Sequence, residues 1–156
     1  EPERRMKDSV NHFLSNNFVI HRDDFNQVKF NTALSGYGYE DTFFAYELKV
    51  KGIETIHILN PVLHDGLEDS TIFLSKIEES LHNLLRLESM CREQAIGFPL
   101  KSKLVQAYQT LCRPLFKPFA LGFTLFLPAL RRKLLSPKPA LWALDLYRLF
   151  YLLKIS

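Results

Sequence analysis

Cysteine is scarce in this chain, which has only Cys91 and Cys112 among its 156 residues. Two cysteines this far apart have neither the spacing of a zinc site nor the number that a disulfide framework needs, so both are excluded. No charged stretch followed by an apolar one comes after Glu1, and a secretory signal is therefore not indicated. A reduced, cytoplasmic location is the prediction.

A long uninterrupted hydrophobic run is also missing. The most apolar stretch, Leu115 to Leu130, has sixteen residues and contains Lys117, Pro118 and Pro128. A helix that crosses a membrane needs about 20 consecutive apolar residues. The sequence therefore predicts no transmembrane segment.

Acidic residues are nearly absent from the last part of the chain. Residues 97–156 carry ten Lys or Arg and a single acidic residue, Asp145, whereas residues 1–96 carry ten Lys or Arg and sixteen Asp or Glu. Such a split predicts two segments with different partners. Because Gly97 and Pro99 also interrupt the helical pattern, we expect an acidic segment, 1–96, and a basic, apolar, mostly helical tail, 97–156.

Hydrophobic residues make up 47% of the chain and aromatic residues 13%, which predicts a folded protein. An apolar, β-branched run at 18–21 and an alternation of apolar and polar residues at 53–59 predict two strands. Apolar residues at helical spacing predict helices over 41–51, 71–93, 101–112 and 140–154, and a proline-interrupted helical stretch over 114–130. In the helix over 71–93, the apolar residues from Ile72 and Phe73 onward should face inward, with Asp69 or Ser70 as the cap.

A glycine-containing loop that ends in two adjacent carboxylates has the clearest chemical content. Gly36 and Gly38 permit tight backbone turns, and Glu40 and Asp41 then open the predicted helix. A helix N-terminus favours ionised carboxylates by about 0.3–1 kcal/mol, and a carboxylate held there can take a proton from an attacking hydroxyl. Acidic residues are also ordinary caps at this position, so a purely structural interpretation stays open.

Several motifs around this loop follow one another in a fixed order. The Gly-x-Gly-x-Glu-Asp run from Gly36 to Asp41 leads to Leu48 and Gly52, and upstream of it come Asn17, Arg22 and Phe30. Downstream, the second predicted strand leads to His64. In order and spacing, about residues 15–90 resemble the acceptor-side, galactosyltransferase C-terminal-like part of family 2 glycosyltransferases, which have the GT-A fold.

The resemblance implies an α/β fold class: the C-terminal part of a GT-A-type nucleotide-diphospho-sugar transferase, followed by the helical tail. It makes 1–96 the acceptor-side part of the catalytic domain. The nucleotide-binding half, with its Asp-x-Asp motif, should precede residue 1. The isolated chain is therefore expected to be inactive.

The resemblance also assigns roles to particular residues. Asp41 would be the general base, and Glu40 would hydrogen-bond the acceptor or support that base. His64 would help to hold a divalent metal, Mn²⁺ or Mg²⁺, on the donor diphosphate, although a lone histidine is often only structural. The acceptor site would be shaped by Gly36, Tyr37, Gly38 and Tyr39, whose aromatic rings could equally belong to the core.

The implied function is that of an inverting, metal-dependent glycosyltransferase. It would move a sugar from a nucleotide-sugar donor to a glycan or glycolipid acceptor. The alternative is a non-catalytic, membrane-associated binding module that has kept the scaffold.

The basic tail offers a further surface. Its last predicted helix is apolar almost all round, with Asp145 and Arg148 as a narrow polar stripe, and the run Arg131 to Lys133 precedes it. Such a helix is buried either in protein or in a membrane interface, so two interpretations stay open. One is peripheral association with an anionic membrane surface at the cytoplasmic face, with Trp142 at the interface; the other is packing on the catalytic domain or in a dimer. Because the cations lie within apolar runs, nucleic acid is not an expected partner.

Overall fold

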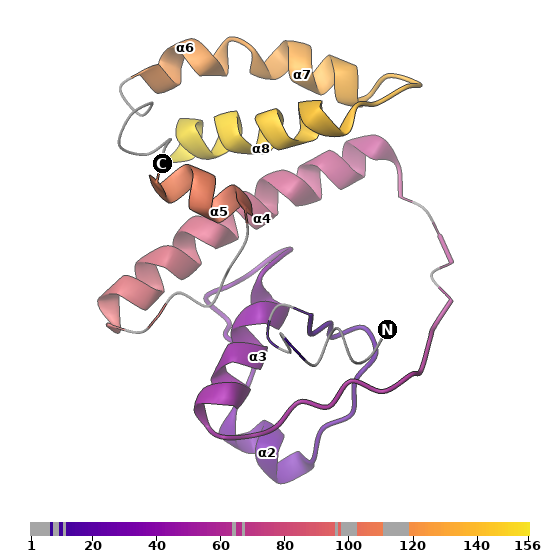
Figure 1. Cartoon of the computed structure of the whole chain (residues 1–156), viewed down its shortest axis with the longest axis vertical. Helices are drawn as coiled ribbons and strands as arrows, with labels where there is room; N and C mark the ends of the chain where they lie inside the picture. The colour runs from indigo at the N-terminus through magenta and orange to yellow at the C-terminus, as the bar shows by residue number, and fades with distance from the viewer. Residues whose placement is uncertain are drawn as a thin grey trace.

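The computed structural model describes residues 7, 10, 12–63, 65–66, 68–95, 97, 103–110 and 119–156. Helices make up 59% of these described residues, and none of them belongs to a strand or sheet. The expected α/β class, as the C-terminal part of a GT-A-type fold, is therefore wrong for this chain. Helices of very different length are connected by irregular segments, and they build one elongated assembly (Figure 1).

Both segments predicted as strands, 18–21 and 53–59, lack regular secondary structure. The alternation that suggested the second strand does exist in the structure, because Ile56 and Ile58 are 64% and 73% exposed while His57 between them is half-buried. A strand also needs a neighbour that bonds its backbone N–H and C=O groups, and within the described ranges none does so. The strand predicted over 53–59 is therefore wrong, although side-chain exposure alternates along part of the segment.

Helices α2 (Arg22–Gln27) and α3 (Glu40–Val50) hold the N-terminal core. The centre of this core is Phe44, which is completely buried and stacks on Phe30 with ring centroids 4.3 Å apart. The helix predicted over 41–51 is confirmed, and its buried residues include Phe44, Ala45 and Leu48. Three more phenylalanine rings pack around the centre: Phe13, Phe18 and Phe25.

Helix α4 (Ser70–Glu93) is the longest element and confirms the helix predicted over 71–93. Asp69 caps it, since its Oδ1 accepts a hydrogen bond of 2.7 Å from the backbone N–H of Thr71. Ile72 and Phe73 are 52% and 46% exposed, so the prediction that they face inward is wrong. At this end of α4 it is Leu74 that packs in the core with the C-terminal helices.

The C-terminal part consists of α5 (Lys103–Ala107), α6 (Ala120–Thr124), α7 (Leu127–Leu134) and α8 (Leu141–Ile155). Helix α8 confirms the helix predicted over 140–154, and α7 begins with a proline in its first turn, where the missing N–H is tolerated. Part of the helix predicted over 101–112 and part of the stretch over 114–130 lie outside the described residues.

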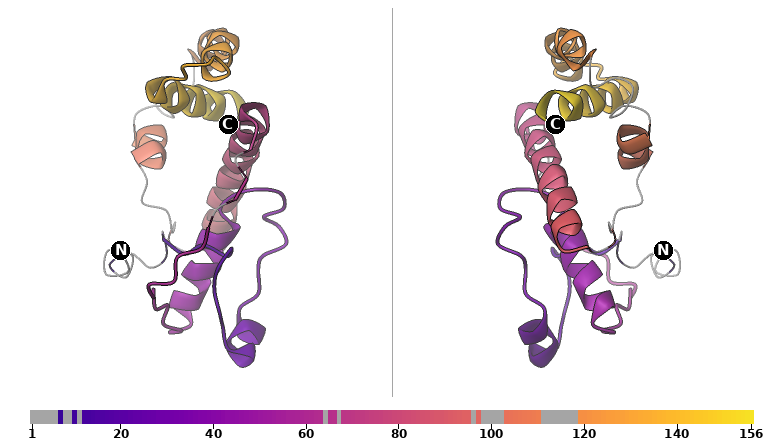
Figure 2. Two further views of the ribbon diagram at one scale, coloured as in Figure 1. Left: turned by 90° about the vertical axis from the view of Figure 1, so that its right-hand side faces the viewer. Right: turned by 90° about the vertical axis from the view of Figure 1, so that its left-hand side faces the viewer.

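Helix α8 lies between α4 and the pair α6 and α7. It packs on all of these helices and on α5. The α6–α8 layer occupies one end of the long axis and α2 the other, and α4 and α3 lie between them (Figures 1 and 2). None of the described helices is both long enough and apolar enough to cross a membrane.

Candidate functional site

The glycine loop, residues 35–39, turns sharply into α3. Gly36, Gly38 and Tyr39 have φ angles of 84°, 101° and 71°. This left-handed conformation is open to glycine but costs about 1–2 kcal/mol for a residue with a Cβ. At Gly38 an added Cβ would also lie 2.5 Å from the Cβ of Ser80. The loop therefore lies directly on α4, and glycine is what permits that approach.

One buried amide fixes the glycine loop to α4. Asn83 is 1% exposed, and its Nδ2 lies 3.0 Å from the carbonyl oxygen of Ser35, 3.3 Å from that of Tyr37 and 3.2 Å from that of Gly38. An amide group has two N–H donors, which three carbonyls share here. Arg86 adds a hydrogen bond of 3.3 Å from Nη1 to the hydroxyl of Ser35. Three carbonyls of the loop are thus bound by one side chain of α4.

Tyr37 is the accessible aromatic residue of the loop, with 49% of its surface exposed. Its backbone N–H donates a hydrogen bond of 3.2 Å to Oε2 of Glu79. The ammonium group of Lys76 lies 5.1 Å from its ring centroid, within the range of a cation–π contact. Lys76 is itself paired with the carboxylate of Glu68. The Tyr37 ring is therefore oriented from α4 while it stays accessible to a ligand.

Tyr39, in contrast, has its side chain in the core. It packs against two buried clusters that involve α4 and α8, and its hydroxyl lies near the guanidinium of Arg148 of α8. Burial raises the pKa of the Tyr39 hydroxyl, and the nearby charge of Arg148 acts in the opposite direction. These contacts compensate for the strained backbone at the N-cap of α3, so α8 helps to hold the start of that helix.

The carboxylate pair, Glu40 and Asp41, occupies the first two positions of α3. Oδ2 of Asp41 accepts a hydrogen bond of 3.0 Å from the backbone N–H of Ser15. Oδ1 of Asp41 and Oε2 of Glu40 are shielded from solvent and have no hydrogen-bond partner among the described residues. A shielded oxygen without a donor costs about 1–3 kcal/mol. A hydroxyl group that reached either oxygen would therefore be bound favourably.

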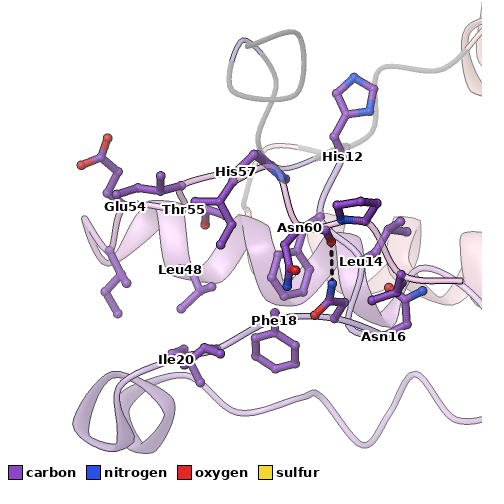
Figure 3. A pocket seen from close by; sticks show the side chains of 18 residues that line it. His12, Leu14, Asn16, Phe18, Ile20, Leu48, Glu54, Thr55, His57 and Asn60 are labelled. Carbon is purple, nitrogen blue, oxygen red and sulfur yellow. Dashed lines mark hydrogen bonds between the residues drawn. The ribbon is translucent and has the colours of Figure 1, made fainter. Parts of the chain in front are cut away.

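An open groove of about 470 Å³ lies between the segments 12–20 and 53–62 (Figure 3). Asn17 bridges its two sides, because its Nδ2 donates a hydrogen bond of 3.1 Å to the carbonyl oxygen of Asn60. Neither carboxylate lines the groove. Asp41 is connected to it through Ser15, which donates a hydrogen bond to Asp41 and whose neighbours in the chain, Leu14 and Asn16, line the groove. The polar side chains of the lining are His12, Asn16, Asn17, Glu54, Thr55, His57 and Asn60.

The structure brings most of the predicted site residues together. Gly36, Tyr37, Gly38, Tyr39, Glu40 and Asp41 form one continuous turn on α4. His64 lies outside the described residues. No three His, Cys, Asp or Glu side chains lie close enough together to hold a metal ion in the ranges that the structure describes. Glu40 and Asp41 alone are too few to make up a divalent metal site, so we assign no step to a metal.

Sequence reasoning missed the α4 residues that position the loop. Glu79 and Ser80 precede Asn83 by about one turn of α4, and each of the three residues contacts the loop. Asn83 had one signal, since it is a polar residue between Leu81 and Leu84 on the buried side of the helix. Arg148 had no such signal, because its contact with Tyr39 depends on how α8 packs.

Comparisons with protein-family models, with curated proteins and with solved structures found no match to this chain. The function is therefore argued from the residues of the site alone.

Proposed function

We propose that this chain supplies the acceptor side of an inverting glycosyl transfer, with Asp41 as the general base. The observation that carries this proposal is the state of its carboxylate. One oxygen is fixed by the backbone of Ser15, and the other has no partner among the described residues. A carboxylate oriented in this way can receive one proton at one atom, which is what a general base has to do.

In the proposed step, Oδ1 of Asp41 accepts the proton of an acceptor hydroxyl while the oxygen of that hydroxyl attacks the anomeric carbon of a nucleotide sugar. The bond to the nucleotide diphosphate breaks, and the diphosphate leaves with the electron pair. A single displacement inverts the anomeric centre. Glu40 would hold a neighbouring hydroxyl of the acceptor through Oε2, and donor binding is assigned to no described residue.

The acceptor class follows from the surroundings of the pair. The Tyr37 ring is accessible and its position is fixed, which suits stacking on the apolar face of a sugar ring. The groove beside Ser15 offers amide and imidazole side chains, whose hydrogen-bonding groups suit sugar hydroxyls. We therefore propose a glycan or a lipid-linked sugar as acceptor. A lipid-linked acceptor places the reaction at the cytoplasmic face of a membrane.

A non-catalytic binding module is the second candidate. It is favoured by the shielding of both free carboxylate oxygens, because a base has to be reached by the hydroxyl that it deprotonates. The two candidates differ in what they require of Asp41. A base is indispensable for transfer, whereas a residue that only starts a helix is not.

Acceptor binding can be tested on the chain itself by nuclear magnetic resonance. A panel of neutral saccharides is added to the isotope-labelled chain, and the backbone amide signals of 35–41 are followed. We expect one class of saccharide to shift these signals and Tyr37→Ala to weaken its binding about two- to tenfold, because stacking on an aromatic ring contributes about 0.5–1.5 kcal/mol. Asp23→Asn, an exposed change on α2, serves as the control. Saccharides that leave 35–41 unshifted, or bind Tyr37→Ala as well as the parent, would contradict the proposed acceptor site.

A further inference from the structure

Exposed apolar side chains surround the turn between α7 and α8. Leu141 is 83% exposed, Trp142 60% and Leu135 41%. A single exposed leucine is ordinary on a protein surface, whereas several that gather at one place indicate an interaction site. These three residues, which we name the apolar tip, lie at the two ends of the short turn 136–140.

The core beneath the apolar tip is well packed. Leu134 and Ala143, the neighbours of the tip on α7 and α8, are 8% and 0% exposed, and Ala140 of the turn packs against the same cluster. Helix α8 then begins with a backbone hydrogen bond of 3.0 Å from the N–H of Ala143 to the carbonyl oxygen of its N-cap, Ala140. The turn that carries the exposed tip residues thus rests on a packed core at the edge of the α6–α8 layer (Figure 1).

Three exposed cations accompany the apolar tip: Arg132 and Lys133 at the end of α7, and Lys138 in the turn. None of the three forms an ion pair with any residue that the structure describes. Arg131 is different, because its Nη1 lies 2.7 Å from Oε1 of Glu78 on α4 and is used inside the fold. The surface around the tip is therefore both apolar and positively charged.

We propose that the apolar tip and these three cations bind the surface of an anionic membrane. Leu135, Leu141 and Trp142 would enter the interfacial region, where tryptophan is favoured, and the cations would meet the lipid head groups. The arrangement of α7 and α8 lets both groups act together, since the apolar residues and the cations all lie within 132–142, around one turn between the two helices. Glycosyl transfer is not needed for this inference, which uses none of the residues of the candidate site.

Other partners match this surface less well. In a symmetric pair of chains the same patch would meet itself, and six cations would be brought together in one contact. The centres of protein interfaces are poor in lysine, and apolar side chains gain little from contact with nucleic-acid phosphates. An anionic bilayer is the partner that offers negative charge and an apolar interior side by side.

The chain contains a single tryptophan, and it lies in the tip, so its fluorescence reports binding directly. The full chain is mixed with vesicles of phosphatidylcholine and phosphatidylglycerol in equal amounts, and separately with vesicles of phosphatidylcholine alone. We expect the Trp142 emission to move to shorter wavelength and the chain to sediment only with the anionic vesicles. Binding should weaken as salt is added, because the charges lie at an exposed surface.

Two variants with matched controls test the two parts of the surface. Lys133→Gln should lower the partition coefficient about fivefold, since one cation near an anionic membrane contributes about 1 kcal/mol; its control is Lys49→Gln, an exposed lysine of α3. Leu141→Asp should lower the partition coefficient about tenfold or more, because it removes an apolar side chain whose transfer from water to the membrane favours binding. Its control is Val50→Asp, at a site 65% exposed. All four positions are exposed, and circular dichroism verifies that each variant folds.

Three results would overturn the proposal. The first is the absence of sedimentation with anionic vesicles, and the second is equal binding to vesicles that carry no charge. The third is a concentration-dependent dimer in which Trp142 is shielded and vesicles have no effect, which would make a second copy of the chain the partner. If Lys49→Gln lowered the partition coefficient as much as Lys133→Gln does, the assignment of binding to the tip would likewise be contradicted.

Discussion

Gly38 shows how a single residue sets the geometry of the candidate site. Its left-handed backbone and its approach to Ser80 both exclude a side chain. Gly122 in α6 is the natural contrast, because nothing lies within 4 Å of the position that its Cβ would take. Replacement by alanine should therefore change the stability of the protein in different ways at the two glycines.

Gly38→Ala should lower the free energy of unfolding by about 2–4 kcal/mol, from the left-handed φ and the clash together. Gly122→Ala should be neutral or stabilise by up to about 1 kcal/mol, since alanine favours helix more than glycine does. Urea denaturation followed by circular dichroism measures both. Equal effects of the two substitutions would show that the loop does not need glycine at Gly38.

Asn83 is the residue on which the conformation of the glycine loop depends most. Asn83→Ala would leave the carbonyls of Ser35, Tyr37 and Gly38 without their donor, at a cost of about 2–3 kcal/mol. Hydrogen exchange should become faster at 35–39 while α4 remains helical. Asn26→Ala, an exposed change on α2, should stay within about 0.5 kcal/mol of the parent. A parent-like exchange rate in Asn83→Ala would remove this residue as the clamp of the loop.

At the scale of single residues, the sequence predicted which residues form the candidate site better than it predicted which residues contact them. The glycines and the two carboxylates were found because their spacing has a local cause, namely the turn and the helix start that follow it. The partners of the loop, Asn83 and Ser80, could not be found in that way, since they become neighbours only when α3 and α4 pack. A polar residue inside an apolar stripe was the only available signal.

Among the elements, the junction of α4, α7 and α8 depends on one polar network. Tyr147 of α8 donates a hydrogen bond to the carboxylate of Glu78 on α4, and Arg131 of α7 pairs with the same carboxylate. Burial, together with the hydrogen bond to Glu78, raises the pKa of Tyr147 to about 12. The network thus joins three helices and contains a group whose ionisation opposes folding.

The sign of the pH dependence follows from that pKa. An unfolded tyrosine ionises near pH 10, so the contribution of Tyr147 is fully present below about 10 and is lost as the pH rises through about 12. We expect Tyr147→Phe to be less stable than the parent at neutral pH by about 1–2 kcal/mol, through loss of its hydrogen bond. The difference should shrink above pH 10. Urea denaturation at a series of pH values measures it, and a constant difference would contradict the role of Tyr147.

Helices and strands differed in how far they could be predicted. The apolar spacing of α4 and α8 reports burial along one face, which a helix produces by itself. The alternation at 53–59 also reports burial. A strand, however, exists only when another strand pairs with it, and the sequence of the segment does not show whether such a partner is present. The α/β fold class failed at this step.

For the whole molecule, the two segments that differ in charge also differ in position. The α6–α8 layer, with the apolar tip and its three cations, lies at one end of the long axis, while α2 and α3 occupy the other part (Figure 2). The contact between Tyr39 and Arg148 connects the two, so the start of α3 is held from the tail. The charge split was visible in the sequence, whereas this connection was not, because it joins residues far apart in the chain.

The central claim is that Asp41 is the base of a glycosyl transfer, and its most direct test is transfer by the full product of the gene that encodes this chain. Asp41→Asn keeps an oxygen that can accept from the N–H of Ser15, so its fold should persist, which circular dichroism verifies. Radiolabelled sugar is followed from a panel of nucleotide sugars to saccharide and lipid-linked acceptors, with Asp23→Asn as the matched control on α2. We predict that kcat/KM falls about 100-fold or more in Asp41→Asn and stays unchanged in Asp23→Asn. Transfer by Asp41→Asn at the rate of the parent, or no transfer by the parent to any acceptor, would contradict the account.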